Sequence, residues 1–251
     1  MDEYLRETAM LNYSHERVKA AASRWSGLPL EEALAGAYYF VRDKIVFGFN
    51  PSLSLLASEV LEWGCGQSVT KAALLMALLR SLGIPCRYRC LGVSKSLYSG
   101  IASGLVYAAM PERLPHAWAE VFYKGRWLSL EGAVVDLTYI TRLQSRFSGH
   151  DGRYIGHCVA PDYLQNPRIE WRGAHTYIQS NAVIDEIGVF PSPDDAPEDF
   201  FKAGGRLWAL FYRLYARGRM NDKLNKARLN KSARKEALIW QDSSRRTKRR
   251  G

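Results

Sequence analysis

The chain has 251 residues, of which 47% are hydrophobic and seven are Trp, and its formal net charge is +10. This length and composition predict one large domain, or one domain with an appendage, that buries a sizeable core. No run of 18 apolar residues exists, so no membrane span is expected, and the N-terminus lacks the basic-then-apolar order of a secretory signal. The four cysteines show no CxxC spacing. We therefore expect reduced thiols and a cytoplasmic protein rather than a disulfide scaffold.

The positive charge is concentrated at the C-terminal end. Residues 202–251 contain 16 Lys or Arg and 3 Asp or Glu, a net charge of +13, whereas residues 1–201 carry −3. The charge of the whole chain therefore does not describe the substrate of the earlier part. For the basic end we expect a solubilising tail, with binding to an acidic partner or nucleic acid as the alternative.

Hydrophobic periodicity predicts mostly helices in the first third of the chain. One helix is expected over residues 2–25 and a second from about Glu31 to Lys44. Residues 52–63 are expected to be a loop with a short helix. Residues 68–82 then form a helix that is apolar on nearly all sides, which is typical of a central helix covered by other elements.

The rest of the chain predicts strands, long loops and a last helix. Residues 87–93 alternate as a strand, and residues 116–123 and 126–130 form a predicted hairpin joined at Lys124-Gly125. Residues 94–112 and 144–175 are expected to be loops, and a helix over 198–217 is expected to pack on the core. We therefore predict one domain over residues 1–218 and a basic tail over residues 219–251.

One turn stands out because it opens the central helix. Gly64-Cys65-Gly66-Gln67-Ser68 precedes a long run of good helix formers, which Gly83 and Pro85 end. Ser68 is thereby predicted to lie at a helix N-terminus. Free N–H groups and partial positive charge at that position favour an anionic nucleophile or a developing oxyanion.

Three motifs in order resemble the transglutaminase core over about residues 30–140. The first is Gly66-Gln67-Ser68 with Leu-Leu-Arg-x-Leu-Gly-Ile-Pro-x-Arg at 78–87, where the family has Gly-Gln-Cys. The second is Pro-His-Ala-Trp-Ala-Glu-Val at 115–121, and the third is Gly-Arg-Trp-Leu-Ser-Leu-Glu at 125–131. The resemblance implies a papain-like α+β fold. In it, a nucleophile-bearing central helix packs on an antiparallel sheet, with helices at both ends of the domain.

The resemblance also assigns roles to particular residues. It implies a Cys–His–Asp acyl enzyme in which Ser68 stands at the nucleophile position, His116 is the base and Glu131, usually Asp, orients the imidazole. Such an enzyme forms an acyl-enzyme with an amide, peptide or acyl substrate and passes the acyl group to an amine or to water. It needs no metal and no organic cofactor. Gln67, Trp63 or Trp118 is expected to contribute to the oxyanion hole or substrate pocket.

Each assignment has an alternative that the sequence leaves open. Ser68 alone reads as a helix N-cap, and Cys65 is a second candidate nucleophile. Asp136 is a rival to Glu131 as the third member of the triad. The His residues at 150, 157 and 175, with Cys158 and Asp162, match no known metal-ligand spacing.

The serine at the nucleophile position has three explanations. It is an engineered Cys-to-Ser change that silences an enzyme, which we favour, or it marks a natural relative that only binds a peptide or protein partner, or it is a genuine nucleophile. A hydroxyl is far harder to ionise than a thiol, whose reference pKa is about 8.5. A site built for a thiolate should therefore lose most of its rate with serine.

Overall fold

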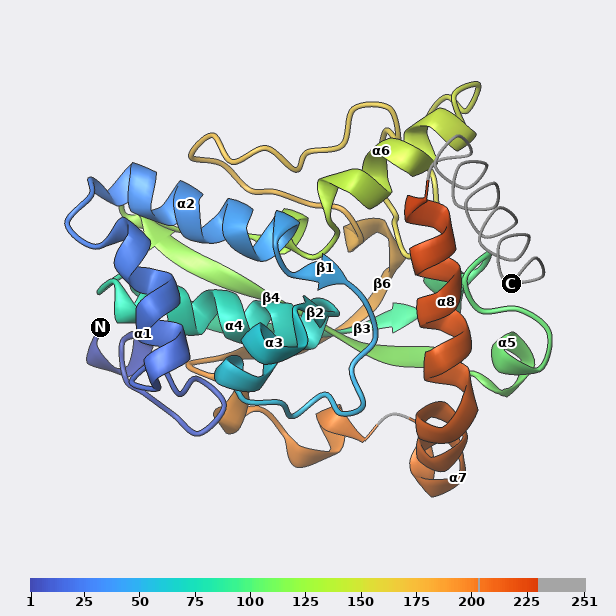
Figure 1. Ribbon diagram of the computed structural model, residues 1–251, viewed down its shortest axis with the longest axis horizontal. Helices are drawn as coiled ribbons and strands as arrows, with labels where there is room; N and C mark the ends of the chain where they lie inside the picture. The colour runs from blue at the N-terminus through green and yellow to red at the C-terminus, as the bar shows by residue number, and fades with distance from the viewer. Residues whose placement is uncertain (203, 230–251) are drawn as a thin grey trace, which may run out of the picture.

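The computed structural model describes residues 1–202 and 204–229. Its core is a two-layer arrangement of one central helix, α4 (Ser68–Ser81), against a four-stranded antiparallel sheet in the order β5-β4-β3-β6. In Figure 1, α4 lies in front of the long strand β4, and helices α1 to α3 gather around it. The predicted α+β class with a helix-covered sheet is confirmed.

The central helix begins and ends where the sequence predicts. Gln67 is its N-cap residue, and the Gln67 N–H donates to the hydroxyl of Thr70 at 3.1 Å. The helix ends at Ser81 with Leu82 as its C-cap, and Gly83 follows at a φ of 72°, which a glycine adopts without strain. All thirteen residues from Ser68 to Arg80 are buried. The expectation of a helix covered on all sides is therefore correct.

The sheet is formed by β3 (Cys86–Ser94), β4 (Arg113–Tyr123), β5 (Arg126–Ser129) and β6 (Val183–Phe190). The hairpin between β4 and β5 turns at Lys124-Gly125, where both residues have positive φ, 48° and 80°. These angles are typical of a tight hairpin turn. The register places His116 of β4 opposite Leu91 of β3.

The N-terminal region differs from the single helix predicted over residues 2–25. It contains η1 (Asp2–Tyr4), α1 (Glu16–Ala22) and η2 (Ser23–Trp25), with irregular chain between. The irregular part is fixed by long-range contacts: the Met10 N–H donates to the carboxylate of Asp194 at 3.1 Å. The next elements are α2 (Leu30–Asp43), β1 (Val46–Phe47), α3 (Ala57–Trp63) and β2 (Cys65–Gly66), and β1 pairs with β2 in parallel.

Short helices connect the strands and also follow the last strand, β6. η3 (Lys95–Tyr98) and α5 (Leu105–Ala109) lie within the predicted loop 94–112, and η4 (Glu131–Ala133) and α6 (Leu137–Arg146) follow β5. The segment after residue 146 has little regular structure until η5 (Ser180–Ala182) and β6. After β6 come η6 (Pro193–Asp195), η7 (Glu198–Phe201), α7 (Gly205–Phe211), the π-helical turn η8 (Tyr212–Ala216) and α8 (Arg217–Arg228).

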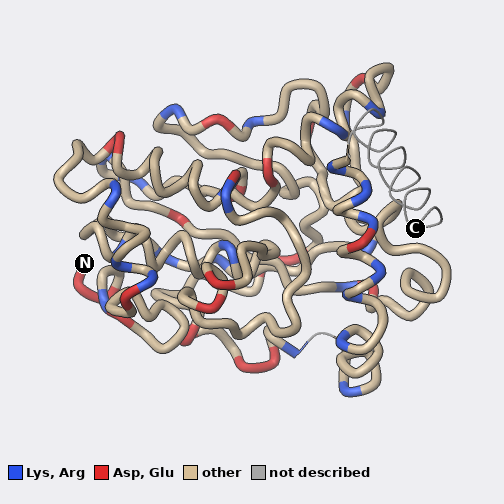
Figure 2. Tube along the Cα trace, in the orientation of Figure 1, with Lys and Arg blue, Asp and Glu red and all other residues tan. Residues whose placement is uncertain are grey.

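The last helix belongs to the packed structure although it is rich in Lys and Arg (Figure 2). Met220 and Leu224 of α8 are buried, and the Asn221 side chain bonds both backbone groups of Phe49, at 2.8 and 3.0 Å. Residues 219–228, which the sequence analysis assigns to the basic tail, thus form most of α8. The rest of that predicted tail, residues 230–251, lies outside the described residues.

The structure also bears on the expected membrane spans and on the cysteines. None of the helices in residues 1–202 and 204–229 has the length and apolar character that crossing a membrane requires. The four cysteines all fall within the described ranges, and all are unpaired.

Candidate active site

Ser68 is the first residue of α4, so it occupies the helix N-terminus that the sequence predicts. Its residue surface is only 4% exposed, and its hydroxyl makes no hydrogen bond to any other described residue. Gly66 is required two residues earlier, because a Cβ there would lie 2.8 Å from the Lys71 side chain and 2.9 Å from the Thr70 hydroxyl. The turn therefore folds tightly over the first turn of the helix and leaves the Ser68 hydroxyl without a partner in the described chain.

His116 and Glu131 form a buried pair. The imidazole Nε2 of His116, in β4, lies 2.9 Å from Oε1 of Glu131, at the start of η4, and both side chains are fully buried. The carboxylate accepts, so Nε2 carries the hydrogen and Nδ1 carries the lone pair. Nδ1 of His116 is buried and has no hydrogen-bond partner among the described residues. This nitrogen is thus available as a proton acceptor.

The carboxyl group of Glu131 is held by main-chain groups that the sequence analysis did not identify. It accepts the N–H of Ile178 at 2.9 Å, of Gln179 at 3.1 Å and of Ser180 at 3.2 Å. These residues lie 47 to 49 positions later in the chain. Backbone N–H groups carry no side-chain signature, so no sequence pattern could have revealed this anchor.

Asp136, the alternative third member, has a different environment. It is the N-cap of α6 and accepts the N–H groups of Phe47 and Tyr139, both at 2.9 Å. Burial alone would raise its pKa, but the hydrogen bonds and charge of Arg228 outweigh this effect and hold the pKa below its usual range. Among the described residues, the carboxylate that contacts the His116 imidazole is Glu131.

The two tryptophans of the predicted pocket lie in different places. The Trp118 ring packs edge-on against His116 at 5.6 Å between centroids and edge-on against Tyr177 at 6.1 Å. Trp63, by contrast, is 48% exposed at the end of α3, with the Arg217 guanidinium 5.9 Å from its ring. Trp118 therefore adjoins the His–Glu pair, whereas Trp63 does not face the cavity described below.

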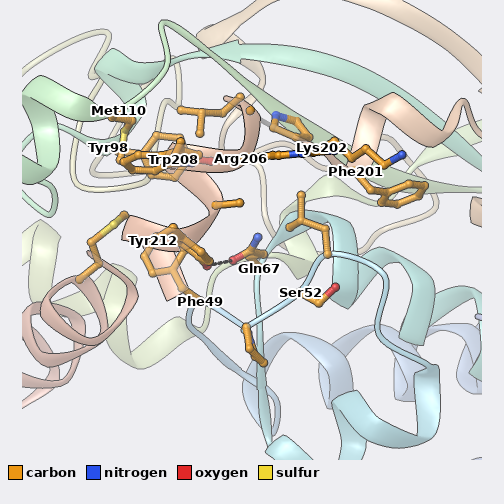
Figure 3. A pocket seen from close by; sticks show the side chains of 17 residues that line it. Phe49, Ser52, Gln67, Tyr98, Met110, Phe201, Lys202, Arg206, Trp208 and Tyr212 are labelled. Atoms are coloured by element: carbon orange, nitrogen blue, oxygen red, sulfur yellow. Dashed lines mark hydrogen bonds between the residues drawn. The ribbon is translucent and has the colours of Figure 1, made fainter. Parts of the chain in front are cut away.

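A cavity of about 390 Å³ adjoins this site (Figure 3). Its lining includes Gln67 and Pro115, the residues that immediately precede Ser68 and His116. Neither Ser68 nor His116 is itself a lining residue, so the cavity reaches the candidate site through these two chain neighbours. Oε1 of Gln67 lies 3.5 Å from the hydroxyl of Tyr212, which also lines the cavity.

Lys71, one turn after Ser68 in α4, is a buried cation that the sequence analysis did not single out. Its amine donates to the Arg42 carbonyl at 3.2 Å, and no carboxylate of the described chain forms an ion pair with it. Burial lowers its pKa to about 7, against a partial opposing effect of Asp136 and Asp43. In the unfolded chain the Lys71 amine keeps its proton up to about pH 10.5. Burial of this amine therefore lowers the free energy of unfolding below that pH.

Replacing this amine should therefore stabilise the fold in a pH-dependent way. We expect Lys71→Met to raise the free energy of unfolding by about 2 kcal/mol at pH 7, after the loss of one hydrogen bond is counted. Between about pH 7 and pH 9 the unfolded state binds more protons, so the native protein gains stability with pH. The advantage of the variant should shrink by about 1 kcal/mol per pH unit over that range.

Urea unfolding of the two proteins at several pH values measures this difference. Lys19→Met, at an exposed position of α1, is the matched control and should show no such trend. A stability difference between Lys71→Met and the native protein that is constant from pH 7 to pH 9 would contradict the lowered pKa.

Part of this chain resembles a known protein family in sequence. Residues 17–132 match the family model of the transglutaminase-like superfamily. A solved structure from Cytophaga hutchinsonii, described as a "putative cysteine protease", is 14% identical with a TM-score of 0.43, and the match covers 77% of this chain and 47% of that one. The chain thus spans about half the length of that protein. No curated protein matches the sequence. The matched segment 17–132 holds Ser68, His116 and Glu131, and over this segment the chain is similar to the transglutaminase-like superfamily.

Proposed function

We propose that this chain is an acyl-transfer site of the transglutaminase type in which Ser68 holds the nucleophile position and silences the reaction. The observation that carries the proposal is the His116–Glu131 pair, joined at 2.9 Å, with Nδ1 of the imidazole left unpartnered in the described chain. The substrate is an amide, peptide or other acyl compound. The acceptor is an amine or water.

The chemistry follows from these groups once residue 68 is a thiol. His116 Nδ1 takes the thiol proton, and Glu131 stabilises the resulting imidazolium through Nε2. The thiolate attacks the acyl carbonyl, the sulfur–carbon bond forms, and the bond to the leaving group breaks as that group receives the proton. The backbone N–H groups at the start of α4 stabilise the developing oxyanion. An amine or water then attacks the thioester and releases the cysteine.

Serine changes the first step. A hydroxyl gives up its proton far less readily than a thiol. In the family pattern, the imidazole accepts a proton from a thiol at the nucleophile position. The native Ser68 protein is therefore expected to react slowly or not at all with acyl donors. The second candidate function, supported by the intact cavity beside the silent nucleophile, is a binding module for a peptide or protein partner.

Restoring the thiol tests the proposal. We expect Ser68→Cys protein, incubated with p-nitrophenyl acetate, to release p-nitrophenolate in a burst and to carry one acetyl group at residue 68 by intact-mass and peptide analysis. Ser68→Ala protein is the control for the four native thiols, of which Cys86, Cys90 and Cys158 are buried. A Ser68→Cys thiol that reacts no faster than Cys65 would count against acyl chemistry and leave the binding module as the better function.

A further inference from the structure

The cavity beside the candidate site runs from a buried apolar floor to an exposed mouth. Its floor consists of side chains that are each less than a tenth exposed, namely Phe49, Tyr98, Met110, Leu114, Trp208 and Met220. Its mouth includes the exposed residues Lys202, which follows η7, and Arg206 of α7 (Figure 3). A concave apolar space of about 390 Å³ lies within the usual range for small-molecule sites.

Much of the cavity lining comes from residues outside the segment that matches the superfamily. The residues from Phe201 to Met220 that line the cavity lie beyond 17–132, the part that matches the superfamily. The Tyr212 hydroxyl ties this wall to the core by donating to the Asn50 carbonyl at 2.8 Å. The C-terminal helices of this chain therefore shape a space that the core alone does not define.

The charged groups at the mouth are all positive. Lys202 and Arg206 line the cavity, and none of its described lining residues is Asp or Glu. Lys202 pairs with Glu198 four residues earlier, whereas Arg206 forms no ion pair with any residue of the described ranges. An exposed guanidinium at the rim of an apolar space is complementary to a ligand that carries an anionic group at the end of an apolar chain.

We infer that this cavity binds an acyl substrate with an apolar chain and a terminal carboxylate. The carboxylate contacts Arg206 at the mouth, the chain lies along the apolar floor, and the acyl end reaches Gln67 beside Ser68. The inference rests on the proposed function for the identity of the acyl end. It adds the substrate class, which the His–Glu pair does not define.

Binding measurements on the native Ser68 protein test this inference without any turnover. The probes are the monoamide of octanedioic acid and octanamide, which share the chain and the amide but differ in the terminal carboxylate. We expect isothermal titration to give a Kd about tenfold lower for the acid, the size of one charge-assisted hydrogen bond. Arg206→Gln should remove this preference and leave octanamide binding unchanged.

Two further variants separate the chain from the charge. Ala209→Trp, at an exposed lining position, should weaken both probes because the indole fills the mouth. Arg213→Gln removes the same charge from the exposed, non-lining side of the same segment and should change neither. Equal Kd values for the two probes would overturn the assignment of the carboxylate, and so would an effect of Arg213→Gln as large as that of Arg206→Gln.

Failure of this inference is distinguishable from failure of the proposed function. If native protein binds neither probe while Ser68→Cys is acetylated at residue 68, the acyl site stands and the substrate class is wrong. If the probes bind as expected while Ser68→Cys stays unreactive, the cavity stands as a ligand site of a binding module.

Discussion

In the Ser68→Cys protein, Glu131→Gln should lower the rate of acylation of residue 68 by about 10³- to 10⁴-fold. The carboxylate now accepts from Nε2 of His116 at 2.9 Å, which leaves the lone pair on Nδ1. A Gln side chain can present its NH2 group to the imidazole instead. The hydrogen then resides on Nδ1, and that nitrogen can no longer accept the thiol proton.

The measurement is the burst of p-nitrophenolate as a function of pH. Glu131→Gln should reduce the burst and shift its pH dependence upward, because only direct ionisation of the thiol remains as a route. Glu120→Gln is the matched control: Glu120 is a buried carboxylate of the same strand as His116, but it pairs with Arg87 and Arg89. That control should cost stability and leave the rate within a few-fold. A comparable loss of rate in both variants would indicate a structural effect only.

Among the substitutions proposed for this protein, replacement of Arg228 should lower the free energy of unfolding the most. Its guanidinium pairs with Asp136 and bonds the Phe47 carbonyl, and so joins the end of α8 to the start of α6. Arg228→Met leaves the Asp136 carboxylate buried with only backbone donors. Breaking one side of a buried ion pair costs about 3–5 kcal/mol, and the free energy of unfolding should fall by that amount.

Urea unfolding measures this loss, with Arg219→Met on the exposed side of α8 as the control. Adding Asp136→Asn to Arg228→Met should restore part of the lost stability, because the unpaired charge is then removed while an oxygen acceptor for Phe47 and Tyr139 remains. No loss in Arg228→Met, or no recovery in the double variant, would show that the ion pair does not hold α8 in place.

The parts of the fold that the sequence predicted are those with local causes. α4 is predicted by its helix formers and by Gly83, and the hairpin by Lys124-Gly125, because each signal acts within a few residues. The order of the Ser68, His116 and Glu131 motifs also located the His–Glu contact. These features require no knowledge of which distant segments meet.

The errors and omissions have long-range causes. The first 15 residues have helical periodicity, yet the carboxylate of Asp194, 184 positions away from Met10, fixes them as irregular chain. Trp63 immediately precedes the Gly64–Ser68 turn in sequence, but at the end of α3 it is exposed. The basic composition of 219–228 resembles a tail, while Met220 and Leu224 bury themselves in the core. The cavity lining likewise depends on the packing of the segment from Phe201 to Met220 against the core.

The main-chain anchor of Glu131 has a consequence for how this protein can diverge. Because the N–H groups of residues 178–180 hold the carboxylate, their side chains can be exchanged freely as far as this contact is concerned. Only proline is forbidden there, since it lacks the hydrogen. The identity of these side chains is therefore set by other contacts, namely the burial of Ile178 and the hydrogen bond from the Gln179 amide to the Cys158 carbonyl at 2.6 Å.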